Sequence, residues 1–198
     1  MVNTKLYVEG GGDRRETRTA CRRGFEFFLR SAGLSGRMPR VVPCGRRDNA
    51  YDDFKTAHMH NDEVAMLLVD AEGPVTAAGP WAHLAKNGGK DSDWKRPKGA
   101  KDRQCHLMVQ MMESWFLADK DALASLYGDG FRKNALPQNL KIEQIPKEDV
   151  RKGLERATRD TNKGAYHKGK HSFAILALLD PVKVTAASPY ADRLIKAL

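Results

Sequence analysis

The sequence predicts an α/β domain with a mainly parallel sheet flanked by helices. Short apolar strands alternate with helical segments through the first two thirds of its 198 residues. The clearest strand signal is the uncharged run 65–69 (AMLLV), which is followed by two acids and then by Gly73-Pro74. A continuous apolar run of this length is typical of a strand that is buried on both faces of a parallel sheet.

The other elements of the first two thirds follow from apolar spacing and from the residues that end each element. Gly10-Gly11-Gly12 separates the first strand from a helix that has Phe27 and Phe28 on its apolar side and that Gly33 ends. The expected strands are residues 5–9, 40–44, 64–69 and 104–109, and the expected helices are 14–32, 49–58, 77–86 and 110–119.

The last third contains more loops, with prolines at 137 and 146. Helical spacing predicts a helix at about 147–159, an apolar helix at 172–179 that stops before Pro181, and a final helix from about Pro189. We therefore expect an α/β core over residues 1–127 and a C-terminal helical region over 128–198 that caps the core, within one domain overall.

The composition indicates an anionic partner. Lys and Arg number 34 against 25 Asp and Glu, which gives a formal net charge of +9. This excess favours nucleic acid, although a merely basic protein would show it too. A polar stretch over 88–103 places Trp94 among basic residues, which suits either base stacking or a solvated loop. Arginines also crowd the first predicted helix, at positions 14, 15, 18, 22, 23 and 30.

Cysteine usage and hydropathy exclude several protein classes. Cys21, Cys44 and Cys105 are widely separated and form no C-x-x-C motif, so neither a disulfide framework nor a zinc site is predicted. No apolar run approaches the length of a membrane span, and no signal peptide is visible before the first strand. We expect a cytoplasmic protein with no membrane segment.

Two carboxylates stand directly after the central strand. Asp70 and Glu72 are one residue apart, and side chains at i and i+2 of an extended chain point the same way. At about 4 Å apart, two such charges repel by roughly 1 to 4 kcal/mol, and a divalent cation is the usual reason to tolerate this. The alternative is that Asp70 caps the next turn and that Glu72 lies in solvent.

Glu9 ends the first strand and adds a third acid. If the two strands are neighbours, Glu9, Asp70 and Glu72 converge on one point at the carboxyl edge of the sheet. Such a cluster suits Mg²⁺ or Mn²⁺, which prefer hard oxygen ligands. Glu113 has mostly apolar neighbours on its predicted helix, so we expect it to point inward and to need a partner, a proton or a metal.

These residues carry a resemblance. Val8-Glu9-Gly10 in a first strand, with Asp70-x-Glu72 after a later apolar strand, resembles the Toprim domain of topoisomerases, primases and OLD-type nucleases. More closely, the chain resembles a bacterial family of unknown function in the Toprim-like group. The matching stretches cover most of the chain and are residues 67–72, 111–119 (MMESWFLAD) and 166–198.

The resemblance implies a Toprim-like sheet with Glu9 as the acid of the first strand and with Asp70 and Glu72 in place of the usual Asp-x-Asp pair. In a nuclease of this kind Glu9 would ligate metal or act as general base, Asp70 and Glu72 would hold metal, and Glu113 would complete or orient the metal shell. Glu72 departs from the Asp of many Toprim domains, and its side chain reaches further by one carbon. Arg46, Lys168 and Lys170 are candidates for phosphate contacts. Proteins of this wider group often accompany ATPases and act in phage defence or DNA repair.

Three functions follow as hypotheses. The first is a Mg²⁺-dependent nuclease that hydrolyses nucleic-acid phosphodiesters, with an ATPase as a potential partner. The second is a catalytically silent subunit that keeps the fold and binds nucleic acid or another protein. The third is a small-molecule phosphohydrolase. The sequence leaves open DNA against RNA, and whether the chain forms a homo-oligomer.

Overall fold

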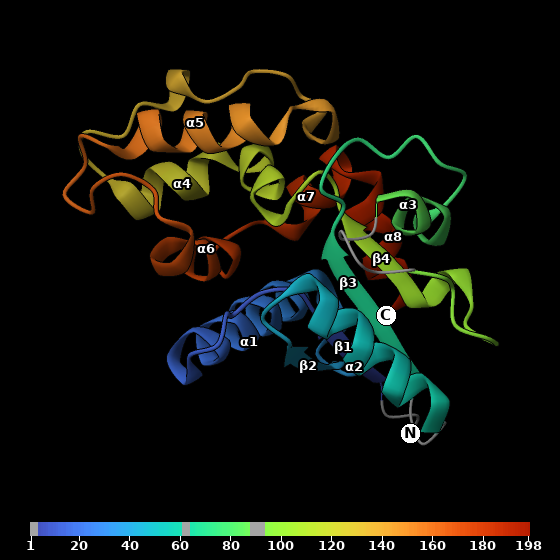
Figure 1. The fold of residues 1–198 in the computed structure, drawn as a ribbon. Helices are drawn as coiled ribbons and strands as arrows, with labels where there is room; N and C mark the ends of the chain where they lie inside the picture. Colours follow the sequence, from blue (N-terminus) through green and yellow to red (C-terminus); the bar gives the residue numbers. More distant parts are fainter. Residues whose placement is uncertain (1–3, 61–63, 88–93) are drawn as a thin grey trace.

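The sheet is parallel throughout, as the sequence predicts. The computed structural model describes residues 4–60, 64–87 and 94–198 (Figure 1). Its strands lie in the order β2-β1-β3-β4, and every neighbouring pair is parallel. Parallel strands need crossover connections, and helices α1, α2 and α3 lie in those connections. The strands are β1 (Thr4–Val8), β2 (Arg40–Pro43), β3 (Val64–Asp70) and β4 (Cys105–Met108).

The helices confirm the α/β class with a helical C-terminal part. Figure 1 shows the helices labelled α4, α5 and α6 beyond the end of β3 at which its arrow points, and α8 beside β4. The longer helices are α1 (Arg15–Leu29), α2 (Arg47–His60), α3 (Pro80–Asn87), α4 (Lys120–Tyr127), α5 (Lys147–Thr158), α6 (Lys168–Leu176), α7 (Pro181–Ala187) and α8 (Pro189–Ala197). The short ones are η1 (Arg30–Leu34), η2 (Asp102–Gln104), η3 (Met112–Ala118), η4 (Lys133–Ala135) and η5 (Ile142–Gln144).

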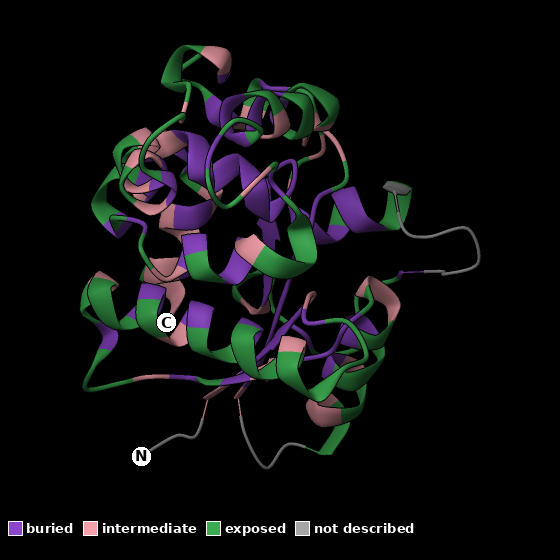
Figure 2. Ribbon diagram, turned by 90° about the vertical axis from the view of Figure 1, so that its left-hand side faces the viewer, coloured by how far each residue is buried: buried purple, intermediate pink, exposed green. Residues whose placement is uncertain are grey.

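The two faces of the sheet bury different apolar layers. Strand side chains alternate between faces, so Leu6 and Leu68 pack in one layer while Tyr7 and Leu67 pack in the other. The first layer includes residues of α1, η3 and the C-terminal helices, and the second includes residues of α2 and α3. Figure 2 shows the purple strands in the interior and green exposed faces on the outer helices. This two-sided burial explains why β3 is apolar along its length.

The C-terminal region is attached to the core at several places. Helix α6 packs on α1, and α8 packs on β4. The Arg193 side chain on α8 donates a hydrogen bond of 2.6 Å to the backbone oxygen of Cys105 on β4. Residues on both sides of position 128 share one apolar layer. In the part of the chain that the structure describes, no helix has the length and apolar character needed to span a bilayer.

Several helices differ from the sequence prediction in type or in bounds, because local hydrogen bonds determine where each helix begins. The segment expected as a helix over 110–119 is the 3₁₀ helix η3, and α4 then begins where the Asp119 side chain accepts a hydrogen bond from the Ala122 N–H. Helix α6 ends before Pro181, as the sequence predicts, although it spans Lys168–Leu176 where the sequence predicts 172–179. Asp180 caps a new helix, α7, with Pro181 in its first turn, where a missing N–H costs nothing.

Trp94 belongs to the core. Its side chain is 1% exposed, its ring stacks on Tyr51 at a centroid distance of 4.6 Å, and the Arg47 guanidinium lies 4.9 Å from the ring centroid. The base-stacking interpretation of this tryptophan is therefore wrong, because the ring has no free face in solvent. Residues 88–93 of the same predicted loop lie outside the described residues.

Candidate functional site

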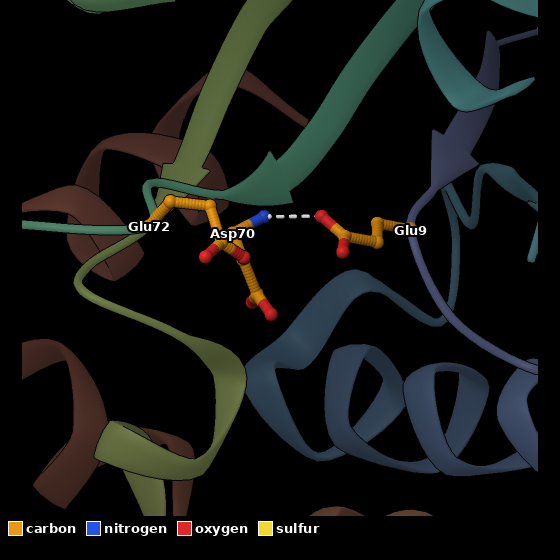
Figure 3. Close-up of side chains that lie close together, drawn as sticks. All are labelled: Glu9, Asp70 and Glu72. Atoms are coloured by element: carbon orange, nitrogen blue, oxygen red, sulfur yellow. Dashed lines mark hydrogen bonds between the residues drawn. The ribbon is translucent and has the colours of Figure 1, made fainter. Parts of the chain in front are cut away.

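Three carboxylates meet at the carboxyl edge of the sheet. Glu9 directly follows β1, Asp70 ends β3, and these two strands are neighbours. One oxygen atom from each of Glu9, Asp70 and Glu72 lies within 4.8 Å of the other two (Figure 3). The structure therefore brings together the three acids that the sequence singles out.

The sequence predicts that an extended chain brings Asp70 and Glu72 together, but the structure brings them together through a turn. Strand β3 ends at Asp70, and Glu72 has a backbone φ of 66°. A non-glycine residue rarely adopts this left-handed conformation, which costs about 1 to 3 kcal/mol unless its surroundings stabilise it. The Glu72 N–H donates to the Gln110 backbone oxygen at 2.9 Å, and this bond helps to hold the turn. A turn thus directs Glu72 toward the other acids.

Backbone amides orient the two inner carboxylates. The Asp70 N–H donates to Glu9 Oε2 at 2.9 Å, and the Met112 N–H donates to Asp70 Oδ1 at 2.7 Å. Asp70 is 3% exposed, whereas Glu9 is half-buried and Glu72 is exposed. Each inner carboxylate keeps a second oxygen, Glu9 Oε1 or Asp70 Oδ2, which these amide bonds leave available to a ligand.

Burial and mutual repulsion raise the pKa values of the inner acids. Burial is the main cause for Asp70, followed by the charge of Glu9, and the pKa of Asp70 is well above its ordinary value. Burial also raises the pKa of Glu9, against a lowering effect from its hydrogen bond with the Asp70 N–H. Both groups would therefore gain from a cation that offsets their charge.

Two lysines from the C-terminal region face the acids. Lys168, the first residue of α6, places its Nζ 3.6 Å from Asp70 Oδ2 and 3.6 Å from Glu113 Oε1. Lys147, the first residue of α5, forms an ion pair with Glu72. Partial burial lowers the pKa of Lys168, but the carboxylates of Asp70, Glu113 and Glu9 outweigh it and raise that pKa. Lys168 is therefore charged, and its side chain is still 60% exposed.

Glu113 lies inside the protein, as the sequence predicts. It is 1% exposed, and its Oε1 accepts a hydrogen bond of 2.9 Å from the Tyr166 hydroxyl. Burial and the Glu113 charge raise the pKa of Tyr166, so this hydroxyl keeps its proton. Glu113 Oε2 is buried and has no hydrogen-bond partner among the described residues. Lys168 links Glu113 to Asp70, which places Glu113 beside the three-acid cluster.

Asp70 and Lys168 both line two cavities. The first has a volume of about 270 Å³ and is bounded by Glu9, the glycines 10–12, Gly45 and Phe173. The second has a volume of about 400 Å³ and is bounded by Glu72, Glu113, Lys147, Arg151 and Tyr166.

The three predicted phosphate contacts have different positions. Lys168 lies at the acids, as described above. Arg46 follows Gly45 at the edge of the first cavity, with a side chain that is 78% exposed and 4.0 Å from Asp48. Lys170 is exposed and lines neither cavity, so the structure does not bring it to the site.

Sequence reasoning missed Lys147 and the hydroxyl of Tyr166. Lys147 follows Pro146 at the start of a predicted helix, and nothing in that pattern connects it with Glu72, 75 residues earlier. Tyr166 begins the basic turn 166–171, which stands out in the sequence. This turn was therefore the available signal for a contact with Glu113. Both contacts depend on how the C-terminal helices pack on the sheet.

Comparison with known proteins gives a family and no activity. No curated protein and no solved structure matches the chain. A family model described as "Domain of unknown function (DUF4276)" matches residues 8–198, a range that includes every site residue discussed above. The chain therefore belongs to the DUF4276 family.

Proposed function

We propose that this protein is a metal-dependent nuclease that hydrolyses phosphodiester bonds of nucleic acid. The observation that carries the proposal is the convergence of Glu9, Asp70 and Glu72, with oxygen atoms within 4.8 Å of one another. Mg²⁺ binds oxygen ligands at about 2.1 Å, so ligand oxygens on one ion lie about 3 to 4 Å apart. Small movements of these side chains would bring the three oxygens to those spacings.

The charges of the site support the same cation. Glu9, Asp70, Glu72 and Glu113 supply four formal negative charges, while Lys147 and Lys168 supply two positive ones. One divalent ion would balance the remainder. The ligand set is entirely oxygen, which suits Mg²⁺ or Mn²⁺ better than zinc or copper. Glu9, Asp70 and Glu72 would hold the ion, and Glu113 would orient Lys168.

The residues of the chain divide the chemistry between them. When bound, such an ion supplies a nucleophilic water and offsets charge on the phosphate oxygens. The free oxygen of Glu9 would either ligate this ion or accept a proton from that water, and burial raises the pKa of Glu9 above its ordinary value. The Lys168 ammonium, between the two cavities, is placed to bind a phosphate oxygen.

The Toprim resemblance extends the proposal. It favours kinship with OLD-type nucleases, and with it an ATPase partner and a role in phage defence or DNA repair. The arrangement of Glu9 after a first strand and Asp70 after a neighbouring strand supports that kinship. These biological roles are proposals that rest on the resemblance.

A cleavage assay tests the proposed function. Plasmid DNA and transfer RNA are incubated with the protein in Mg²⁺ or Mn²⁺, and in parallel with EDTA. We expect cleavage only with metal, abolished in Asp70→Asn and retained in Lys152→Gln, a control whose lysine pairs with Glu148 outside the site. No cleavage in either metal, or cleavage that persists in EDTA, would reject the nuclease.

The same assay separates the alternatives. Binding of nucleic acid without cleavage would indicate the catalytically silent subunit. Hydrolysis of a chromogenic phosphate ester without cleavage of nucleic acid would indicate a small-molecule phosphohydrolase.

A further inference from the structure

Helix α1 and its N-cap residue present a row of unpaired arginines. Arg14, Arg18 and Arg22 are spaced four residues apart, so they lie on one face of the helix, and all three are exposed. We call these three residues the arginine row. Within residues 4–60, 64–87 and 94–198, no arginine of this row forms an ion pair. Like charges at this spacing destabilise a helix, which calls for a compensating partner.

Several basic residues on other helices of the same protein pair with acids. On α5, Arg151 pairs with Glu148 and Glu155 at 2.8 and 2.6 Å, and Lys152 pairs with Glu148 at 3.2 Å. On α8, Lys196 pairs with Asp192 at 2.6 Å. In the described part of the chain no acid pairs with the arginine row, although Glu26 lies four residues after Arg22, so the charge of the row remains available. This contrast within one chain distinguishes the row from an ordinary solvated helix face.

Hydrogen bonds fix the row beside the first cavity. Arg18 Nε donates to the Gly12 oxygen at 3.1 Å, and Arg22 Nε donates to the Val41 oxygen of β2 at 3.3 Å. Gly12 borders the first cavity, and β2 is the edge strand of the sheet. The row thus passes Gly12 at the border of the cavity and extends along α1 toward the edge strand β2, and Figure 1 shows α1 beside β2.

Arg46 continues the positive surface on the other side of the glycines. Gly10 and Gly45 exchange backbone hydrogen bonds of 2.9 and 2.8 Å, which places the loop of Arg46 against the glycine turn. Arg46 is largely exposed. The cavity that contains Glu9 and Asp70 is therefore flanked by arginines from two separate segments.

We propose that the arginine row, with Arg46, binds the sugar-phosphate backbone of nucleic acid and guides a strand into the first cavity. From Arg14 to Arg22 the helix rises about 12 Å, which equals the axial rise of about three to four base pairs of a duplex at about 3.4 Å each. Arginine suits this role because its planar guanidinium binds phosphate through two parallel hydrogen bonds. The delivery of a strand to the acids rests on the proposed function. The binding of nucleic acid by the arginine row does not require cleavage and can be tested separately.

The test compares two triple variants that remove the same charge. Arg14→Gln, Arg18→Gln and Arg22→Gln remove the row. Lys55→Gln, Lys152→Gln and Lys196→Gln remove three lysines that already pair with acids. Binding of a fluorescent 20-nucleotide DNA and its RNA equivalent is measured in EDTA between 50 and 300 mM salt, so that cleavage does not interfere.

The row variant is expected to lose about 100-fold or more in affinity at 0.1 M salt, and its slope of log affinity against log salt should fall by about 2 to 3. The control variant should stay within a few-fold of wild type. Equal losses in both variants, or wild-type affinity in the row variant, would overturn the proposal. If wild type binds through the row but cleaves nothing, the nuclease fails while this surface stands.

A second measurement does not depend on how the variants fold. Wild-type protein is labelled with an arginine-selective glyoxal reagent, with and without the oligonucleotide, and the labelled sites are read by mass spectrometry. Protection of Arg14, Arg18 and Arg22, with Arg156 of α5 unprotected, supports the proposal. Protection of Arg156 with the row still labelled would place the nucleic acid elsewhere and overturn it.

Discussion

Asp70→Asn separates the chemistry of the site from its folding. The amide has nearly the size of the carboxylate, so no cavity forms. Its Oδ1 can still accept the 2.7 Å hydrogen bond from the Met112 N–H. The substitution therefore changes mainly the charge of a side chain that is 3% exposed.

The structure gives the magnitude of that change without metal. At an effective dielectric constant of about 20, charges 4.8 Å apart repel by about 3.5 kcal/mol, and Asp70 faces both Glu9 and Glu72 within that distance. The attraction to Lys168 at 3.6 Å is worth about 4.6 kcal/mol on the same scale. Since solvent screens Lys168 and Glu72, Asp70→Asn should be about 0 to 2 kcal/mol more stable than wild type in chelator.

With metal bound, wild type should instead be more stable than Asp70→Asn. A ligand at 100 times its dissociation constant stabilises the folded state by about 2.7 kcal/mol. For a chain of 198 residues this corresponds to a rise in Tm of about 5 to 11 °C. Wild type should show that rise with Mn²⁺, and Asp70→Asn should lose most of it because the variant lacks one of the three ligands.

Leu68→Ala is the matched control in the same strand. Leu68 is fully buried and lies two residues before Asp70, so its truncation should cost about 2 to 5 kcal/mol. That variant should keep the metal-induced rise in Tm, since the acids are untouched. The assay is thermal unfolding of the three proteins with EDTA and with Mn²⁺. If Asp70→Asn in EDTA is destabilised as much as Leu68→Ala, then Asp70 is a structural cap and the metal-site reasoning is refuted.

Four further predictions follow from the structure. Burial raises the pKa values of Glu9 and Asp70 above the ordinary 4.5 and 3.8. Because metal binds the deprotonated carboxylates, Mn²⁺ affinity should increase with pH above this range. Calorimetry that shows pH-independent binding would contradict this prediction. In EDTA the folded state then binds more protons than the unfolded chain, so stability should fall as pH rises from about 4, and this slope should shrink in Asp70→Asn. Burial lowers the pKa of His106 from 6.5 to about 4, so the contribution of His106 to stability should decrease as pH falls through that window. Urea unfolding at several pH values should therefore show wild type becoming less stable relative to His106→Gln as pH falls, whatever the total stability of either protein does. Glu113→Gln keeps a hydrogen-bond acceptor for Tyr166 but removes a negative charge beside Lys168. This variant should cleave nucleic acid more slowly than wild type while it binds the same number of Mn²⁺ ions. Loss of Mn²⁺ binding would instead identify Glu113 as a metal ligand.

The sequence was sufficient for the sheet and for the meeting of the acids. A strand that is apolar on both faces requires covering layers on both sides, and β3 has them. Parallel strands end at one edge, so Glu9 and Asp70 meet once β1 and β3 are neighbours. Both inferences depend on local patterns and on general rules of sheet construction.

The remaining features depend on long-range packing or on single hydrogen bonds. Glu72 reaches the cluster through a left-handed turn, which no pattern in residues 70–74 indicates. Lys147 and Lys168 reach the acids because α5 and α6 dock beyond the ends of the strands. Trp94 was expected in a polar loop, yet it packs on Tyr51 because its large apolar ring contributes more when buried.

The most direct test of the central claim is an anomalous-scattering map from a crystal of the protein soaked in Mn²⁺. The proposed function predicts a peak within coordination distance of oxygen atoms from Glu9, Asp70 and Glu72, and no peak there in a crystal of Asp70→Asn. A fully soaked wild-type crystal without a peak among these three carboxylates would contradict the metal site and the nuclease with it.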